Sequence, residues 1–98
     1  MIDFNPIKGH EKKVYRPAIV VSNNVFNEYT KMSIFCPISS NTKEFPTHYI
    51  LEDSINISGS VFCEHSRSID YESRKIKFIE KCSDNDLISI LTLFNACL

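Results

Sequence analysis

Several features that would direct a chain to a particular environment are missing from these 98 residues. Acidic and basic residues nearly balance, with a formal net charge of -1, so any nucleic-acid binding requires a local basic patch rather than an overall positive field. No apolar run approaches the roughly 20 residues that span a bilayer, and the first residues lack the basic and apolar regions of a signal peptide. We therefore expect no membrane association and a cytoplasmic location.

The four cysteines show no spacing typical of a metal site. They stand singly, without a Cys-x-x-Cys pair and without a histidine at zinc-finger distance: Cys36, Cys63, Cys82 and Cys97. Cys36 and Cys63 lie in apolar runs, where cysteine behaves as a small buried hydrophobe in a reducing compartment. We expect no metal and no cofactor.

Glycine and proline are scarce, at two and four residues, while 43% of the chain is hydrophobic. This composition excludes a disordered or low-complexity protein. The length suits a single domain over residues 1–98, with no room for a separate substrate domain. A core of this size stabilises the chain only modestly, so we expect two copies to pair as a homodimer.

Hydrophobic periodicity predicts several short strands. The clearest is 17–22, a β-branched run that ends at the turn-forming Asn23 and Asn24. Further strands are expected at 32–39, 49–51, 60–64 and 75–81, the last with Ile76 and Phe78 on one face. Proline lacks the amide hydrogen of a sheet ladder, so Pro37 predicts an edge or a bulge within 32–39.

A helix is expected after the strands. Ser83 caps it by accepting from the amide of residue 86, and Asp84 and Asp86 favour the positive end of its dipole. Its apolar surface is wider than the stripe that covers one core, which predicts an additional contact: Leu87, Ile88, Ile90, Leu91, Leu93, Phe94 and Leu98. Strands followed by one helix are typical of a small barrel or strongly bent antiparallel sheet with a helix packed on it.

Two strand ends carry residues suited to phosphate chemistry. Arg16 directly precedes the buried strand at 17–22, where its guanidinium can bind a phosphate through two donors. Ser39 and Ser40 place hydroxyls where the next strand opens into the polar loop that begins at Asn41. Surface arginines and loop-entry serines are common, so neither position is specific by itself.

Four segments in order resemble the MazF/PemK toxin family. Residues 3–11 (Asp-Phe-Asn-Pro, then Lys-Gly-His-Glu) are similar to the end of the family's first strand and the following loop, and 16–22 (Arg-Pro-Ala-Ile-Val-Val-Ser) to its arginine-bearing strand. Residues 36–40 (Cys-Pro-Ile-Ser-Ser) are similar to the strand that ends in the catalytic threonine or serine. Residues 45–48 (Phe-Pro-Thr-His) then lead into the next strand. The fourth segment, 67–70 (Arg-Ser-Ile-Asp), matches a further family stretch. The resemblance covers nearly the whole chain.

This resemblance implies a mostly β (α+β) fold, an SH3-like small barrel of about five to seven strands with a C-terminal helix. It implies a homodimer that binds single-stranded RNA, and a cognate MazE-like antitoxin as partner. The catalytic pair carried over by motif is Arg16 and Ser39. The positions expected to contact RNA are Gly9, His10, Glu11, Lys13, Ser40, Asn41, His65 and Arg67.

The implied reaction is attack of a ribose 2′-hydroxyl on the neighbouring phosphate, leaving a 2′,3′-cyclic phosphate and a 5′-hydroxyl. A guanidinium and a hydroxyl donor stabilise the charge that develops on the non-bridging oxygens. DNA lacks this nucleophile and should not be cut. Arg16 is permanently charged and suits an electrostatic role, so proton transfer stays open among His10, Glu11 and His65. No short motif encodes the cleavage sequence.

The chain departs from the family pattern at three places. Ser39 replaces the commoner threonine and keeps its hydroxyl. His65 stands where many relatives carry glutamine, which affects base recognition or the subunit contact. The chain starts at Met1-Ile2-Asp3, without the Gly-Asp and apolar residues that normally open the first strand, and this predicts an exposed sheet edge.

Two other functions are compatible with the sequence. The same architecture serves toxins that act on a DNA topoisomerase by protein contact alone, and an N-terminally truncated relative would be inactive.

Basic residues form two groups that fit either an RNA groove or ordinary solvated faces: Lys8, Lys12, Lys13 and Arg16, then Arg67, Arg74, Lys75 and Lys77. For the aromatic residues Phe26 and Phe45, core packing is expected.

Overall fold

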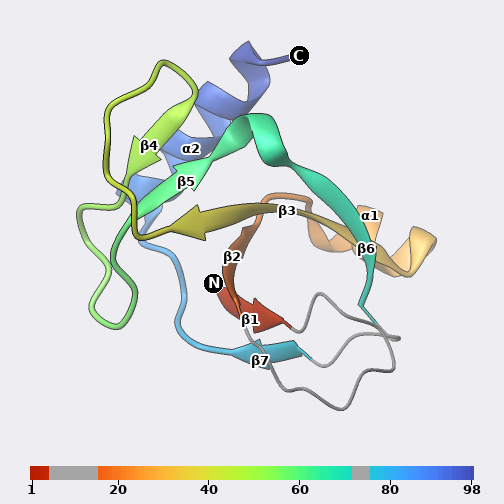
Figure 1. Ribbon diagram of the computed structural model, residues 1–98. Helices are drawn as coiled ribbons and strands as arrows, with labels where there is room; N and C mark the ends of the chain where they lie inside the picture. The colour runs from red at the N-terminus through yellow and green to blue at the C-terminus, as the bar shows by residue number, and fades with distance from the viewer. Residues whose placement is uncertain (5–15, 72–75) are drawn as a thin grey trace.

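The computed structural model describes residues 1–4, 16–71 and 76–98. Within these ranges the chain forms a seven-stranded antiparallel sheet and a long C-terminal helix (Figure 1). The strands are β1 (Ile2–Phe4), β2 (Arg16–Val20), β3 (Met32–Ser39), β4 (His48–Ile50), β5 (Ser60–Phe62), β6 (Arg67–Asp70) and β7 (Ile76–Phe78). The helices are α1 (Asn24–Thr30), the 3₁₀ turn η1 (Cys63–His65) and α2 (Asp84–Ala96).

Strand β3 is the centre of the sheet. The order is β4-β5-β3-β2-β1-β7, and β6 pairs with the first half of β3 while β5 pairs with its last two residues. The chain from β5 through η1 to β6 thus follows one side of β3 and kinks at η1, which bends the sheet strongly (Figure 1). The described parts of β4 and β7, at the two ends, do not pair with each other. The predicted fold class and strand number are confirmed.

Pro37 lies where the pairing of β3 changes partner. On one side it pairs with Ala18 of β2. On the other side, the pairing with β6 ends at Phe35 and the pairing with β5 begins at Ile38, so Pro37 lies in the gap between them. A residue without an amide hydrogen therefore stands at an interruption of the ladder, as the sequence predicts.

Two expectations about local structure are wrong. Asn23 and Asn24 do not simply form a turn: the Asn23 side chain accepts a hydrogen bond from the Phe26 amide at 2.9 Å and caps the short helix α1. At the start of the chain, β1 pairs with β2 on one side and with β7 on the other, but its register on β2 ends at Ala18, so Ile19 and Val20 have no partner in β1, in line with the expected exposed edge. Phe45 is 56% exposed rather than part of the core, while Phe26 is half-buried.

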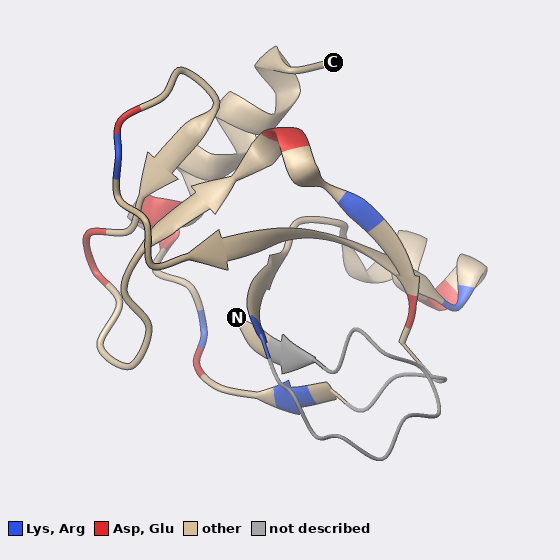
Figure 2. Ribbon diagram, viewed as in Figure 1, with Lys and Arg blue, Asp and Glu red and all other residues tan. Residues whose placement is uncertain are grey.

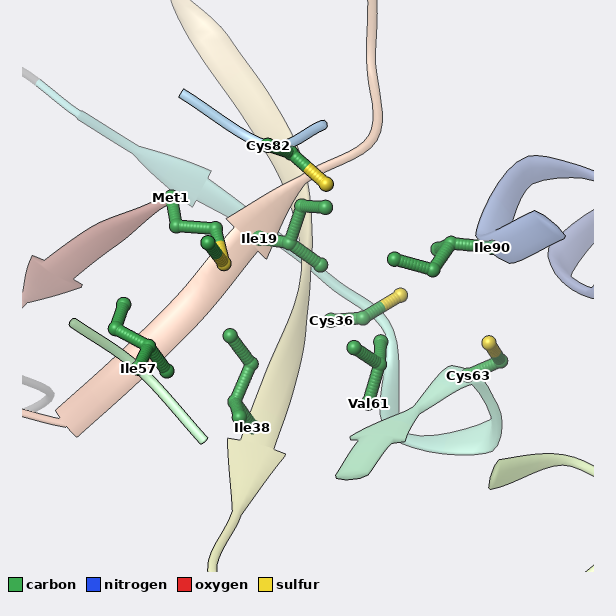
Figure 3. Close-up of a cluster of buried hydrophobic side chains, with 9 residues drawn as sticks. All are labelled: Met1, Ile19, Cys36, Ile38, Ile57, Val61, Cys63, Cys82 and Ile90. Carbon is green, nitrogen blue, oxygen red and sulfur yellow. The ribbon is translucent and has the colours of Figure 1, made fainter. Parts of the chain in front are cut away.

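The main core lies between one face of the sheet and α2 (Figure 3). Its buried members come from the strands, the loops and the helix: Met1, Ile19, Cys36, Ile38, Ile57, Val61, Cys63, Cys82 and Ile90. The prediction for Cys36 and Cys63 is confirmed, since both are free and buried. Contact with the Cys63 thiol and burial raise the pKa of Cys36, so this thiol stays protonated and inert.

A smaller core lies on the opposite face of the same sheet. It consists of Ile2, Ala18, Phe35 and Ile69, with Val20 packed against it. Ala18 and Phe35 are next to Ile19 and Cys36 of the main core, and successive side chains of a strand point to opposite faces. Strands β2 and β3 therefore contribute to both clusters.

The N-terminus of α2 is fixed by its cap and by a buried carboxylate. As predicted, Ser83 Oγ accepts from the Asp86 amide at 3.1 Å. Asp86, fully buried, accepts from the Tyr49 hydroxyl at 2.6 Å and from the amides of Asp53 and Glu52 at 3.1 and 3.3 Å. Burial alone would raise the pKa of Asp86, but these hydrogen bonds lower it below its usual value.

Part of the apolar surface of α2 is exposed. Ile90 is fully buried, whereas Ile88 is 66% exposed, and beyond the helix end Leu98 is 86% exposed. This agrees with a helix whose apolar surface is wider than one core needs. No helix in the described part of the chain has the length and apolar character to cross a bilayer.

Candidate active site

Arg16 and Ser39 lie on the same face of the sheet, at neighbouring strand ends. Arg16 is the first residue of β2 and Ser39 the last residue of β3. The antiparallel register pairs Ala18 with Pro37 and ends there, and Arg16 and Ser39 each lie two residues beyond that pair on their own strands. Side chains two residues apart on a strand share a face, and directly opposed residues share it as well. Both side chains therefore project from the face opposite α2.

The Ser39 hydroxyl is held at the start of the following loop. Ser39 is half-buried, and its Oγ accepts a hydrogen bond from the Asn41 amide at 3.1 Å. Asn41 in turn accepts from the Lys43 amide at 3.0 Å through its side-chain oxygen. Ser40 and Asn41 are exposed. The loop after β3 is thus folded locally around the Ser39 hydroxyl, with its polar side chains accessible.

Gly59 fixes the backbone of Ser39 from the neighbouring strand. It directly precedes β5 and has a φ of 136°, a conformation that favours glycine. A Cβ atom at this position would lie 2.1 Å from the carbonyl oxygen of Ser39. Only a residue without a side chain allows this approach, so Gly59 sets how closely β5 packs against the end of β3.

The Arg16 guanidinium is not engaged by the described part of the protein. Arg16 is exposed, and within residues 1–4, 16–71 and 76–98 its side chain has no hydrogen-bond or ion-pair partner. With respect to the described residues, its charge and its fork of donors can therefore bind an external anion.

Arg67 brings a second positive charge to the same face. It is the first residue of β6 and is paired with Phe35, which shares the face of Ser39 four residues along β3. Figure 2 shows basic positions at the starts of β2 and β6, the strands that flank β3. His65 in η1 is exposed and meets the Phe62 ring edge-on at 5.7 Å. Four predicted contacts lie outside the described residues: Gly9, His10, Glu11 and Lys13.

A histidine that the sequence reasoning did not select also lies on this face. His48 of β4 is paired with Phe62 of β5, and the two rings stack at 3.7 Å with 2° between their planes. Its Nε2 lies 2.7 Å from Glu64 Oε2. Burial raises the pKa of Glu64, but hydrogen bonds from its own backbone and from His48 outweigh this effect and lower it. No sequence spacing links positions 48 and 64, because their contact depends on the β4–β5 register.

A cavity of about 560 Å³ borders this aromatic group. Among the residues that line it are Phe45, His48 and Ile50, with the carboxylates of Glu44 and Glu52. Phe45 stands 5.0 Å from His48 between ring centroids, and it and Ile50 are both exposed. The face that carries Arg16 and Ser39 thus continues into an aromatic surface with acidic rather than basic neighbours.

The arrangement suits stabilisation of a phosphate that gains negative charge. One exposed guanidinium, a hydroxyl donor and a second basic side chain share a face, and α2 does not cover it. Among the described residues, no group of three or more His, Cys, Asp or Glu side chains could hold a metal ion. The guanidinium, the hydroxyl and the second basic side chain suit electrostatic and hydrogen-bond stabilisation in phosphoryl chemistry.

Comparison with known proteins identifies the family. The family model described as PemK-like, MazF-like toxin of type II toxin-antitoxin system matches residues 1–98. The chain belongs to this family. The resemblance drawn from the four sequence segments is thereby confirmed.

Two curated relatives of this MazF-like chain are endoribonucleases of Escherichia coli. Endoribonuclease PemK is 26% identical over 95 residues, which cover 93% of this chain and 71% of that protein. Endoribonuclease toxin MazF of strain K12 is 30% identical over 73 residues, which cover 74% of this chain and 65% of that protein. Both relatives are endoribonucleases, the enzyme class predicted from the sequence.

Solved structures of MazF proteins share the fold. The Deinococcus radiodurans MazE–MazF complex (Form-II) has a TM-score of 0.83 at 25% identity, covering 98% of this chain and 88% of that chain. A mycobacterial endoribonuclease in complex with its cognate antitoxin has a TM-score of 0.76 at 15% identity, covering 96% and 88%. The second likeness supports the fold alone.

Proposed function

We propose that this MazF-like toxin is a metal-independent, sequence-specific endoribonuclease that cleaves single-stranded RNA, with residues 1–98 acting as one toxin domain. The observation that supports the proposal is the β2–β3 register, which ends two residues from both Arg16 and Ser39 and, by strand alternation, assigns both side chains to one face. The family membership and the named activity of the relatives support it.

The ribose 2′-hydroxyl is the nucleophile and attacks the adjacent phosphate. The Arg16 guanidinium binds the non-bridging oxygens, and the Ser39 hydroxyl donates a hydrogen bond to one of them. Both interactions strengthen as negative charge builds up in the transition state, so they lower the barrier more than they stabilise the bound substrate. Expulsion of the 5′-oxygen leaves a 2′,3′-cyclic phosphate and a 5′-hydroxyl.

Arg16 acts as an electrostatic clamp rather than a base, because a guanidinium does not lose its proton near neutral pH. The groups of a type suited to move the proton are His10, Glu11 and His65, joined by His48. His48 is separated from Ser39 by strand β5 and by two residues of register, which puts its backbone about 12 Å away by the usual strand dimensions. We therefore assign the aromatic group of Phe45, His48 and Phe62 to the neighbouring nucleotide, where its exposed ring, Phe45, stacks against a base.

The remaining parts of the proposal concern assembly. The toxin acts in the cytoplasm as a homodimer, and a MazE-like antitoxin inhibits it. The exposed apolar residues Ile88 and Leu98 provide contact surface on the side of α2. The Deinococcus relative was solved as a complex of MazF with MazE.

Incubation with a long single-stranded RNA in EDTA tests the activity. We expect discrete fragments with 5′-hydroxyl ends, no cleavage of DNA of the same sequence, and fragment formation at least about 100-fold slower with Arg16→Ala. Sequencing the fragment ends then identifies the recognised sequence. Intact RNA together with tight topoisomerase binding would replace this function by action through protein contact, and absence of both activities would indicate an inactive relative.

A further inference from the structure

Ser60 is a buried hydroxyl that the proposed reaction does not yet use. Its side chain is fully buried, and its Oγ has no hydrogen-bond partner among the described residues. A buried polar group that makes no hydrogen bond destabilises the folded protein, and such groups are rare in folded proteins. Ser60 therefore requires a physical explanation.

Its position relates it to Ser39. The register of β3 and β5 pairs Ser39 with Ser60 directly, so the two side chains share a face of the sheet. Directly opposed residues of an antiparallel pair have Cβ atoms about 4.5–5.5 Å apart, within reach of a hydrogen bond between two serine hydroxyls. Gly59, next to Ser60, packs against the Ser39 carbonyl and keeps β5 close to this end of β3.

The hydrogen-bond capacity of Ser39 leaves one place for such a partner. A serine hydroxyl has one donor hydrogen and two acceptor lone pairs. Ser39 Oγ uses one acceptor site for the Asn41 amide. In the proposed reaction its hydrogen points to the phosphate, so one acceptor site remains.

We propose that Ser60 is a positioning residue whose hydroxyl donates to Ser39 Oγ when RNA is bound. Resting on the proposed function, this assigns every hydrogen-bonding site of Ser39: the Asn41 amide and the Ser60 hydroxyl donate to its oxygen, and its own hydrogen binds the phosphate. The two donors fix the rotation of Ser39, and a hydroxyl that accepts hydrogen bonds donates more strongly. Ser60 itself touches no substrate atom.

The test is a double-mutant cycle between Ser39 and Ser60, measured with an RNA oligonucleotide containing the mapped cleavage site. We expect Ser60→Ala to lower kcat about 5- to 10-fold with KM unchanged, the size expected for one hydrogen bond. In the Ser39→Ala background, the second change should have no further effect, because the group it positions is gone. Ser58→Ala, an exposed serine two residues away, is the matched control and should match the wild type.

Thermal unfolding separates this role from a structural one. Ser60→Ala removes an unpaired buried hydroxyl, so its Tm should equal or exceed that of the wild type while its kcat falls. Ser60→Cys keeps the volume with a weak donor, and should reproduce the kcat loss if Ser60→Ala folds poorly.

If the wild type cleaves RNA, any of three results would overturn this inference alone. The first is a wild-type kcat in both Ser60→Ala and Ser60→Cys. The second is an equal loss of kcat from Ser60→Ala in the wild-type and Ser39→Ala backgrounds, and the third is a loss of kcat that accompanies a fall in Tm. A wild-type protein that does not cleave RNA would end the proposed function and this inference with it.

Discussion

The two faces of the sheet differ in what they do with the same strands. Toward α2, β2 and β3 contribute buried apolar and cysteine side chains, such as Ile19, Cys36 and Ile38. On the other face, a small apolar cluster is bordered by Arg16, Ser39 and Arg67, which stay at least partly accessible. Because alternate residues of a strand face opposite ways, one strand contributes to both stability and the site. The comparison predicts that substitutions on the two faces affect different measurements.

The largest effect on stability is expected from the core face. Ile90 is fully buried between α2 and the sheet, so Ile90→Ala leaves a cavity and should lower the free energy of unfolding by about 2–5 kcal/mol. Urea unfolding measures this change. At a temperature where the variant is folded, its cleavage rate per folded molecule should match that of the wild type. A selective loss of cleavage would show that the two faces are not separable.

The largest effect on cleavage is expected from Arg16. Arg16→Ala should lower the rate at least about 100-fold, the scale for losing one preorganised charge stabiliser. Its stability should change by less than about 0.5 kcal/mol, because the side chain is exposed. Single-turnover cleavage and urea unfolding of the same preparation give both numbers. An unchanged rate would remove Arg16 from the catalytic pair.

A loss of similar size is expected from Ser39→Ala, whereas Ser39→Thr should be tolerated because it keeps the hydroxyl. The same RNA substrate serves for all three proteins. Equal activity in all three would move the catalytic hydroxyl elsewhere, with Ser40, the next and exposed residue, examined first.

The smallest effect, about 1–2 kcal/mol of stability, is expected from Asp86→Asn, which keeps an acceptor oxygen but removes the charge. The pKa of Asp86 is lowered in the folded protein, so its charged form adds stability above the unfolded-state value of 3.8. That contribution is lost as pH falls through this value toward the folded-state pKa. The difference between wild type and variant should be full at pH 7 and smaller near pH 3. An equal difference at both pH values would contradict this linkage.

The sequence predicted those features that depend on local patterns. The bounds of β3, the Ser83 cap of α2 and the strand ends that carry Arg16 and Ser39 follow from β-branched runs, a polar cap and a change to loop composition. The resemblance to a family then supplied the chemistry that neither strand end specifies by itself.

What the sequence did not predict depends on distant contacts. The pair of His48 with Glu64 requires the β4–β5 register, and the kink at η1, which divides the expected strand at 60–64, comes from the change of partner along β3. An aspartate in the first turn of a helix is usually exposed, so the burial of Asp86 follows only from the Tyr49 side chain and the 52–53 backbone. Helix α1 depends on one side-chain cap within a segment of turn-forming residues.

The central claim is that Arg16 and Ser39 act on one phosphate whose attacking nucleophile is the substrate's own 2′-hydroxyl. The most direct measurement uses an RNA oligonucleotide with a single 2′-deoxy substitution at the mapped cleavage site, compared with the same substitution one nucleotide away. We predict that the first substitution abolishes cleavage and that the second leaves it within a few-fold of the unmodified RNA. Continued cleavage at the 2′-deoxy position would contradict the account.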